Sequence, residues 1–221
     1  MQRVLEPEVM DSLEEAIEYD AMDFTSVNQA FAHDTLNLAP VKASVLDAGT
    51  GTARIPILIA SQRPDWQIIA VDLSPAMLEI ADKNVREANL SHCIDLQKVD
   101  AKKLPYGDDQ FDLVISNSLV HHLTEPLPFF QEVKRVLRPQ GGLLFRDLLR
   151  PASLTIVEEM VKAIGPDYSP QQTGLFSDSL RASFTLDEIS ALLSATGLHN
   201  INLYQSSDRH WTAIKSFGTF L

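Results

Sequence analysis

The stretch Val45-Leu46-Asp47-Ala48-Gly49-Thr50-Gly51-Thr52-Ala53 decides the fold of this 221-residue chain. A short apolar run ends in an acid and then breaks into two glycines. Glycine lets the backbone turn sharply and approach a ligand closely, so this order is typical of a buried parallel strand that turns into a helix. Taken alone the match is weak, because Arg54 occupies the third glycine position of a dinucleotide-binding fingerprint.

The same alternation of strand and helix continues along the chain. Apolar runs predict strands at 43–47, 67–72, 93–99, 111–117 and 143–147, and amphipathic segments between them predict helices at 53–61, after Ser74, and at about 126–137. Further helices are predicted at 153–164 and 185–195, a loop at 165–177, and an antiparallel strand pair at 200–206 and 211–217. The chain is therefore expected to form a three-layer, doubly wound α/β fold with a seven-stranded sheet, six strands parallel and one antiparallel.

Two short amphipathic helices are expected within residues 8–34, ahead of the first strand. We expect residues 1–40 to form an N-terminal helical cap and residues 41–221 to form one globular domain. The segment can be a packing cap or a lid, and the sequence favours the cap. If it is a lid, Tyr19, Asn28 and Phe31 are the side chains to follow.

The amino-acid composition indicates which classes of partner this chain can bind. The net charge of −12 disfavours nucleic acid and anionic membranes, since both recruit Lys and Arg. The sequence shows no apolar stretch of membrane-spanning length and places acids where a signal peptide would be apolar, so a cytoplasmic protein is expected. Cys93 is the only cysteine, which excludes an intrachain disulfide and a multi-thiolate metal site.

Polar residues follow every one of the five expected parallel strands. They are Asp47 with Gly49 and Gly51, Asp72, Asp100, Asn117 with Ser118, and Arg146 with Asp147. Such sheets bind ligands beyond the carboxyl ends of their strands, so five polar ends at one edge indicate a ligand crevice. Asp72 stands where a carboxylate can accept the hydroxyls of a ribose; Ser74-Pro75 already supplies the helix start that Asp72 could otherwise cap.

Read in order, these segments resemble the motifs of class I S-adenosylmethionine-dependent methyltransferases. The resemblance rests on 45–53, on Val71-Asp72-Leu73-Ser74-Pro75, on Val99-Asp100-Ala101, on 111–117 and on 133–142. It covers about residues 40–150 and is closest to the small-molecule branch often called methyltransferase type 11 or 25. It implies a Rossmann-like methyltransferase fold with S-adenosylmethionine as cofactor, S-adenosylhomocysteine as product and a small-molecule acceptor.

The resemblance also implies the cofactor contacts. The methionine end would be held at the glycine turn, the ribose by Asp72, the adenine by Leu73, Asp100 and Ala101, and the region near the sulfonium by Asn117 and Ser118. The full set of expected cofactor-binding residues is Asp47, Gly49, Thr50, Gly51, Arg54, Asp72, Leu73, Met77, Asp100, Ala101, Asn117 and Ser118. For Arg54, pairing with the cofactor carboxylate and simple exposure to solvent stay equal alternatives.

Candidate catalytic groups follow strands four and five. His121 and His122 come after the fourth strand, where a histidine can act as a base, and Asp147 ends the fifth. Hydrogen bonding at a helix start is the commoner role for such histidines. No metal is expected, because adjacent residues of a regular helix point in different directions. Tyr168 and Arg181 could shape the acceptor pocket if residues 165–182 fold over the crevice.

Two other functions stay open. A nicotinamide-dependent oxidoreductase would share the first strand, the glycine turn and the acid on the second strand. A catalytically silent S-adenosylmethionine-binding module would look identical at the cofactor site. The acceptor and the oligomeric state are left open by the sequence.

Overall fold

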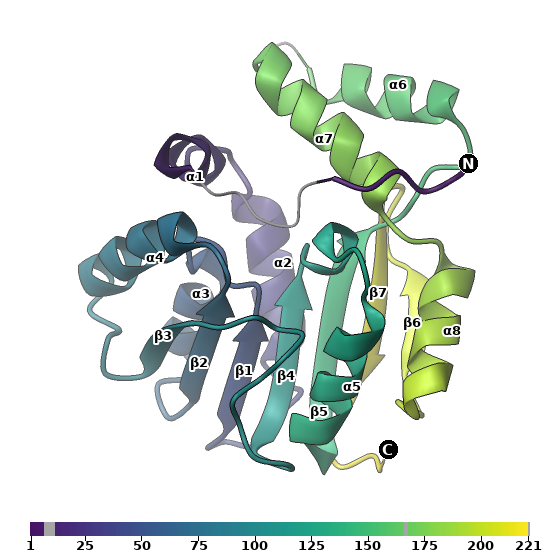
Figure 1. Cartoon of the computed structure of the whole chain (residues 1–221). Coiled ribbons are helices and arrows are strands. Elements are labelled where there is room, and N and C mark those ends of the chain that lie inside the picture. Colours follow the sequence, from purple (N-terminus) through teal and green to yellow (C-terminus); the bar gives the residue numbers. More distant parts are fainter. Residues whose placement is uncertain (7–11, 166–167, 221) are drawn as a thin grey trace.

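A computed structural model gives the structure of the protein and describes residues 1–6, 12–165 and 168–220. Its centre is a seven-stranded sheet in the order β3-β2-β1-β4-β5-β7-β6 (Figure 1). The strands are β1 (Ser44–Ala48), β2 (Gln67–Asp72), β3 (Ile94–Lys98), β4 (Phe111–Asn117), β5 (Leu137–Leu148), β6 (Asn202–Gln205) and β7 (His210–Lys215). Strands β1 to β5 pair in parallel, and β7 runs antiparallel between β5 and β6, as expected from the sequence.

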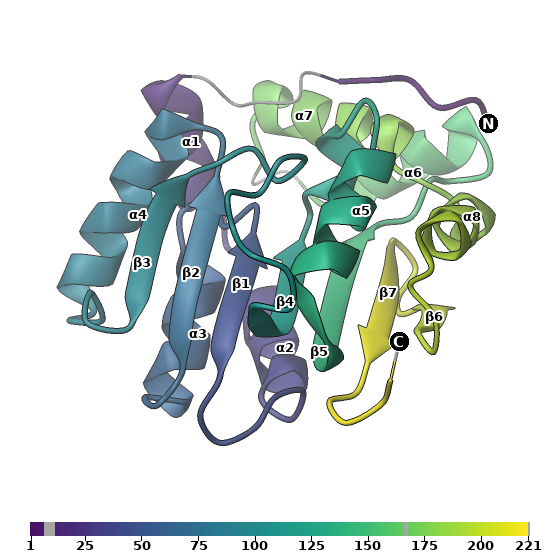
Figure 2. The ribbon, with the colours of Figure 1, turned by 60° about the horizontal axis from the view of Figure 1, so that its bottom comes forward.

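Helices form the outer layers and one end of the molecule. They are α1 (Leu13–Asp20), α2 (Thr25–Thr35), α3 (Arg54–Gln62), α4 (Pro75–Glu87), the 3-10 turn η1 (Val120–His122), α5 (Leu127–Val136), α6 (Leu154–Ala163), α7 (Pro170–Ala182) and α8 (Leu186–Thr196). Figure 2 shows α5 and α8 on one face of the sheet and α2 and α3 on the other. Within the described part of the chain, no helix is long and apolar enough to cross a membrane.

The central strands are buried on both faces, which explains their continuous apolar runs. Val45 packs into the core on the side of α2 and α3, and its neighbour Leu46 packs into the core on the side of α5 and α8. Both side chains are fully buried, because consecutive residues of a strand point to opposite faces. The apolar run before the glycine turn therefore lies in the middle of the sheet.

The segment expected as a loop at 165–177 is largely helical, so that prediction was wrong. The helix α7 begins at Pro170, after a capping box in which Ser169 accepts a hydrogen bond from the backbone of Gln172 and the Gln172 side chain accepts one from the backbone of Ser169. The glycine and prolines of the segment concealed this start, although serine followed by proline and a glutamine is a helix-start pattern. Helices α6 and α7 lie above the carboxyl ends of the strands (Figure 1).

Strand β5 begins earlier than expected. Phe111 of β4 pairs with Leu137, but Leu113 pairs with Gly142, so the pairing shifts by three residues within a short distance. The glycine at 142 is required there, because a Cβ atom would lie 2.0 Å from the backbone oxygen of Leu38. The connection between α2 and β1 thus packs directly on the backbone of β5.

The N-terminal segment reaches across the molecule to the last third of the chain. We call residues 1–6 the N-terminal strap; it runs beside the C-terminal end of α7 (Figure 1). The backbone nitrogen of Val4 donates to the oxygen of Arg181, and the N-terminal amine donates to the oxygen of Ala152. Helix α2 packs on α3 and places Phe31 in the main core, so α2 belongs to a structural layer, while the division at residue 40 stays a prediction.

Candidate active site

A cavity of about 1140 Å³ opens at the carboxyl edge of the sheet. It lies beside β1 and β4, where the strand order reverses, which is the position expected for a ligand in a doubly wound sheet. All twelve residues expected to bind the cofactor line this cavity: Asp47, Gly49, Thr50, Gly51, Arg54, Asp72, Leu73, Met77, Asp100, Ala101, Asn117 and Ser118. The structure brings them together; their individual contacts with a cofactor stay predictions.

The glycine turn adopts a backbone that favours glycine. Gly49 has a φ of 76° and Gly51 a φ of 54°. The backbone nitrogens of Gly49 and Thr50 both donate to the oxygen of Val71 at 2.9 Å, which ties the turn to β2. A Cβ atom on Gly49 would lie 2.9 Å from the Cβ atom of Leu119. The turn is therefore closely packed on one side and faces the cavity on the other.

Asp72 holds this turn in place. Its Oδ2 accepts a hydrogen bond from the backbone nitrogen of Gly51 at 2.8 Å, and its Oδ1 accepts one from that of Ser74 at 2.9 Å. Ser74 caps α4, as the sequence indicated. Burial raises the pKa of Asp72, although these backbone hydrogen bonds oppose the shift. A carboxylate oxygen has two lone pairs, so both oxygens can still accept from a ligand hydroxyl.

Asp47 is a buried acid whose charge the surrounding protein leaves uncompensated. Its side chain is 2% exposed, and Oδ2 has no hydrogen-bond partner among the described residues. Burial raises the pKa of Asp47 to about 7. Because an unpaired buried carboxylate is costly, a cationic group in the cavity would stabilise it. S-adenosylmethionine carries an ammonium and a sulfonium, so this site fits the cofactor expected from the sequence.

Arg54 and Asp100 have local partners. The guanidinium of Arg54 makes two hydrogen bonds to the Asp20 carboxylate, at 2.9 and 2.6 Å, with half of the side chain exposed. Asp20 belongs to α1 and was not anticipated as a partner. Oδ1 of Asp100 accepts a hydrogen bond from the backbone nitrogen of Lys102 at 2.9 Å. Both residues line the cavity, and their expected cofactor contacts would have to form beside these interactions.

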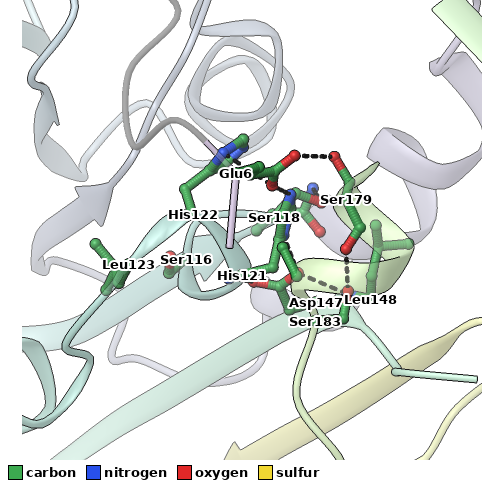
Figure 3. Close-up of polar contacts among 12 residues, drawn as sticks. Glu6, Ser116, Ser118, His121, His122, Leu123, Asp147, Leu148, Ser179 and Ser183 are labelled. Carbon is green, nitrogen blue, oxygen red and sulfur yellow. Dashed lines mark hydrogen bonds and ion pairs between the residues drawn. The ribbon is translucent and has the colours of Figure 1, made fainter. Parts of the chain in front are cut away.

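His121, which lines the cavity, pairs with Asp147, and Figure 3 shows their contact. The Nδ1 atom of His121 lies 2.5 Å from Oδ1 of Asp147, and its backbone nitrogen donates to Oδ2 at 3.1 Å. Burial alone would lower the pKa of His121, but the adjacent Asp147 carboxylate raises it. Both histidines line the cavity, whereas Asp147 does not. Asp147 is thus bonded to a cavity-lining histidine without lining the cavity itself, and its expected role as a base stays a prediction.

Glu6 lies against both histidines and was not anticipated from the sequence. Its Oε1 lies 3.5 Å from Nε2 of His121 and 3.2 Å from Nδ1 of His122, and its Oε2 accepts a hydrogen bond from Ser179 at 3.0 Å (Figure 3). The two imidazole rings lie 4.1 Å apart, centroid to centroid. Adjacent side chains point in different directions on a regular helix, but η1 is a single 3-10 turn. Both imidazole rings therefore lie beside the same Glu6 carboxylate.

The strap that carries Glu6 is anchored by Arg3. One guanidinium nitrogen donates to the backbone oxygens of His121 and Leu123, both at 2.9 Å, and the guanidinium lies 3.8 Å from the centre of the Phe184 ring. No local pattern marks Glu6 or Arg3 as site residues, since more than 110 positions separate them from η1. Only folding the N-terminal strap onto the middle of the chain reveals the contact.

Helix α7 lies beside η1 and lines the cavity with one face. The residues on that face follow helical spacing: Gln172, Leu175, Phe176 and Ser179 all line the cavity. Tyr168 also lines it, as suggested, whereas Arg181 does not and bonds to Asp178. From the N-terminal segment Tyr19 and Asn28 reach the cavity, while Phe31 is buried in the core.

Comparison with known proteins agrees with this geometry. Residues 46–145 match a family model described as a methyltransferase domain. The chain is 27% identical to an arsenite methyltransferase of Halobacterium salinarum over 94% of this chain and 53% of that protein, and 30% identical to a malonyl-[acyl-carrier protein] O-methyltransferase of a Marinomonas species over 78% and 60%. A solved structure of a putative S-adenosyl-L-methionine-dependent methyltransferase from Methanococcus maripaludis superposes with a TM-score of 0.73 at 23% identity, covering 100% and 98% of the two chains.

Together the doubly wound sheet, the glycine turn and the acid-lined edge define the class I S-adenosylmethionine-dependent methyltransferases. The matched methyltransferase domain covers residues 46–145, a little under half of the chain, and the fold and the matched proteins support membership of this class. It spans about half the length of the arsenite methyltransferase it matches. The cofactor of the class is S-adenosylmethionine, and the unpaired Asp47 carboxylate and the open glycine turn fit it.

Proposed function

We propose that the protein transfers the methyl group of S-adenosylmethionine to a small-molecule acceptor. One observation carries the proposal: a single cavity joins the acid and glycine edge at β1 and β2 to the His121–Asp147 pair at β4 and β5. When bound, the cofactor supplies a methyl group already activated by its sulfonium. The protein then has mainly to align an acceptor atom with that methyl group.

The cofactor half of the proposal rests on the residues around the glycine turn. Asp47 provides the negative charge for the cationic methionine end, and Asp72 holds the turn while retaining lone pairs for the ribose. Asn117 and Ser118 end β4 between this region and η1, so they stand at the junction of the two halves. A nicotinamide cofactor offers no cation near its phosphates to compensate Asp47, and the comparisons do not favour that alternative.

The acceptor half rests on η1 and α7. We propose that His121 and His122 contact the acceptor and that Asp147 positions His121 through two hydrogen bonds. The face of α7 that carries Leu175 and Phe176 gives this end apolar as well as polar walls. Matched methyltransferases are named for arsenite in one case and for an acyl-carrier-bound malonyl group in another, so the acceptor is left as a class.

Calorimetry and a methylation screen test the proposal. The wild-type protein should bind S-adenosylhomocysteine with one site per chain and should transfer labelled methyl groups to at least one member of a panel of metabolites. His122→Ala should reduce turnover on that acceptor while retaining S-adenosylhomocysteine binding, and the exposed His92→Ala should change neither. Binding of NADH with no heat from S-adenosylhomocysteine would refute the proposal; cofactor binding without any methyl transfer would favour the silent module.

A further inference from the structure

Three potential metal ligands converge where the N-terminal strap meets η1. They are Oε1 of Glu6, Nε2 of His121 and Nδ1 of His122, and all lie within 4.8 Å of one another. Two imidazole nitrogens and one carboxylate oxygen are a frequent ligand set for Zn²⁺ and other divalent first-row transition metals. We propose that these three side chains bind one such metal ion, with Zn²⁺ as the ion to test.

The distances match coordination better than direct pairing. A zinc ion with ligand bonds of about 2.0–2.2 Å in tetrahedral geometry places neighbouring ligand atoms about 3.4 Å apart. The Glu6 oxygen lies 3.5 Å from the His121 nitrogen and 3.2 Å from the His122 nitrogen. The first distance is too long for a normal hydrogen bond, and Oε1 of Glu6 accepts no hydrogen bond from any described residue although it is buried.

The surrounding hydrogen bonds orient the ligands as metal sites require. Nδ1 of His121 faces the Asp147 carboxylate, which leaves Nε2 directed toward Glu6. A carboxylate behind a metal-binding histidine fixes the ring and its tautomer, and this arrangement is usual in zinc sites. On the other side, Ser179 donates to Oε2 of Glu6 and leaves Oε1 for the metal. Asp147 belongs to β5 and Ser179 to α7, so two different elements orient the ligand side chains.

Charge favours a cation in the same place. Glu6 and Asp147 are 6% and 1% exposed as side chains, so two carboxylates are buried within one cluster. Two imidazolium rings could balance them, but the ring centroids lie 4.1 Å apart and two such cations would repel each other. One divalent cation with two neutral imidazoles gives the same balance without that repulsion. The guanidinium of Arg3, which donates to backbone oxygens nearby, adds one positive charge beside the two carboxylates.

The site would link the strap to the acceptor end of the cavity. Three protein ligands leave a fourth position open on a zinc ion, as in catalytic zinc sites. Because His121 and His122 line the cavity and Glu6 is not among its lining residues, that position would face the acceptor. Resting on the proposed function, this role suits acceptors that bind metal through oxygen, nitrogen or sulfur. His121 would then act on the acceptor through the ion.

Titration calorimetry with Zn²⁺ on tag-free, chelator-treated protein tests the site. Wild-type protein should bind one Zn²⁺ per chain, and Co²⁺ at the same stoichiometry should give the visible absorption of a tetrahedral site. Glu6→Gln and His122→Ala should each weaken Zn²⁺ binding at least 100-fold, and Asp147→Asn about 10–100-fold as an outer contact. The matched exposed controls, Glu14→Gln and His92→Ala, should leave the affinity unchanged.

Two results overturn the inference: no stoichiometric Zn²⁺ binding by the wild-type protein, or binding that survives both Glu6→Gln and His122→Ala. S-adenosylhomocysteine binding, measured on the same samples, shows that each variant is folded. It also separates the two proposals, because cofactor binding without Zn²⁺ binding overturns only the metal site, and Zn²⁺ binding without cofactor binding overturns only the methyltransferase proposal.

Discussion

Replacing Asp47 with asparagine should stabilise the protein without cofactor and abolish its response to the cofactor. The carboxylate is 2% exposed, and burial raises its pKa from an ordinary 3.8 to about 7. A group whose pKa is raised by folding favours the folded state when protonated, and this contribution is lost as the pH rises from 3.8 through 7. Asparagine has a similar shape and no charge to bury, so it avoids this loss.

The size of the effect follows from the pKa. Between pH 5 and pH 7 the unfolded carboxyl is ionised and the folded one is not, so the two pH units correspond to about 3 kcal/mol. The free energy of unfolding of Asp47→Asn relative to wild-type protein should therefore rise by about 3 kcal/mol between pH 5 and pH 8. For a chain of this size, that corresponds to a change in the melting-temperature difference of about 6–12 °C.

Thermal unfolding at pH 5 and pH 8, with and without S-adenosylhomocysteine, measures both consequences. Wild-type protein should gain stability from the ligand at pH 8, whereas Asp47→Asn should gain little. The exposed Asp65→Asn serves as the control and should behave as wild type. If Asp47→Asn showed the same pH dependence as wild-type protein, Asp47 would not be the buried titrating group, and the charge argument for the cofactor site would fail.

Three further predictions concern other parts of the molecule. Asp72→Ala removes both hydrogen bonds that hold the glycine turn, so calorimetry should show S-adenosylhomocysteine binding weakened about 10-fold or more, at about 1.4 kcal/mol per factor of ten. Gly142→Ala would place a Cβ atom 2.0 Å from the Leu38 oxygen and should prevent stable folding in denaturant titrations, whereas Gly174→Ala, with open space in α7, should stabilise by about 0.5–1 kcal/mol. Burial lowers the pKa of Lys215 to about 8, which disfavours its charged form in the folded state; stability measured by urea unfolding should therefore rise as the pH increases from 8 toward 10.5, and Lys215→Met should remove this rise.

Local patterns in the sequence were sufficient to predict the sheet and the polar residues at its carboxyl edge. Fully buried parallel strands need continuous apolar runs, and the tight turns after them need glycine or polar residues, so strand, turn and helix each leave a short-range signal. Asp47, Asp72 and Asn117 lie at the ends of such strands, and the shared direction of parallel strands places them at one edge. The helix α7 was missed because its proline and glycine conceal a capping box that encodes its start.

The surroundings of His121 and His122 were decided by tertiary structure alone. Glu6, His122 and Ser179 come from the two ends and the middle of the chain, and no periodicity relates them. Whether Asp147 acts as a base or orients His121 depends on a contact between two strand ends, and whether adjacent histidines converge depends on a 3-10 turn. The sequence by itself therefore determined which residues stand at the carboxyl edge of the sheet, because the patterns of strands and turns are set by residues close together in the chain. The contacts of Glu6, His121 and His122 were decided only when distant segments packed together, because they depend on the relative placement of the sheet, α7 and the N-terminal strap.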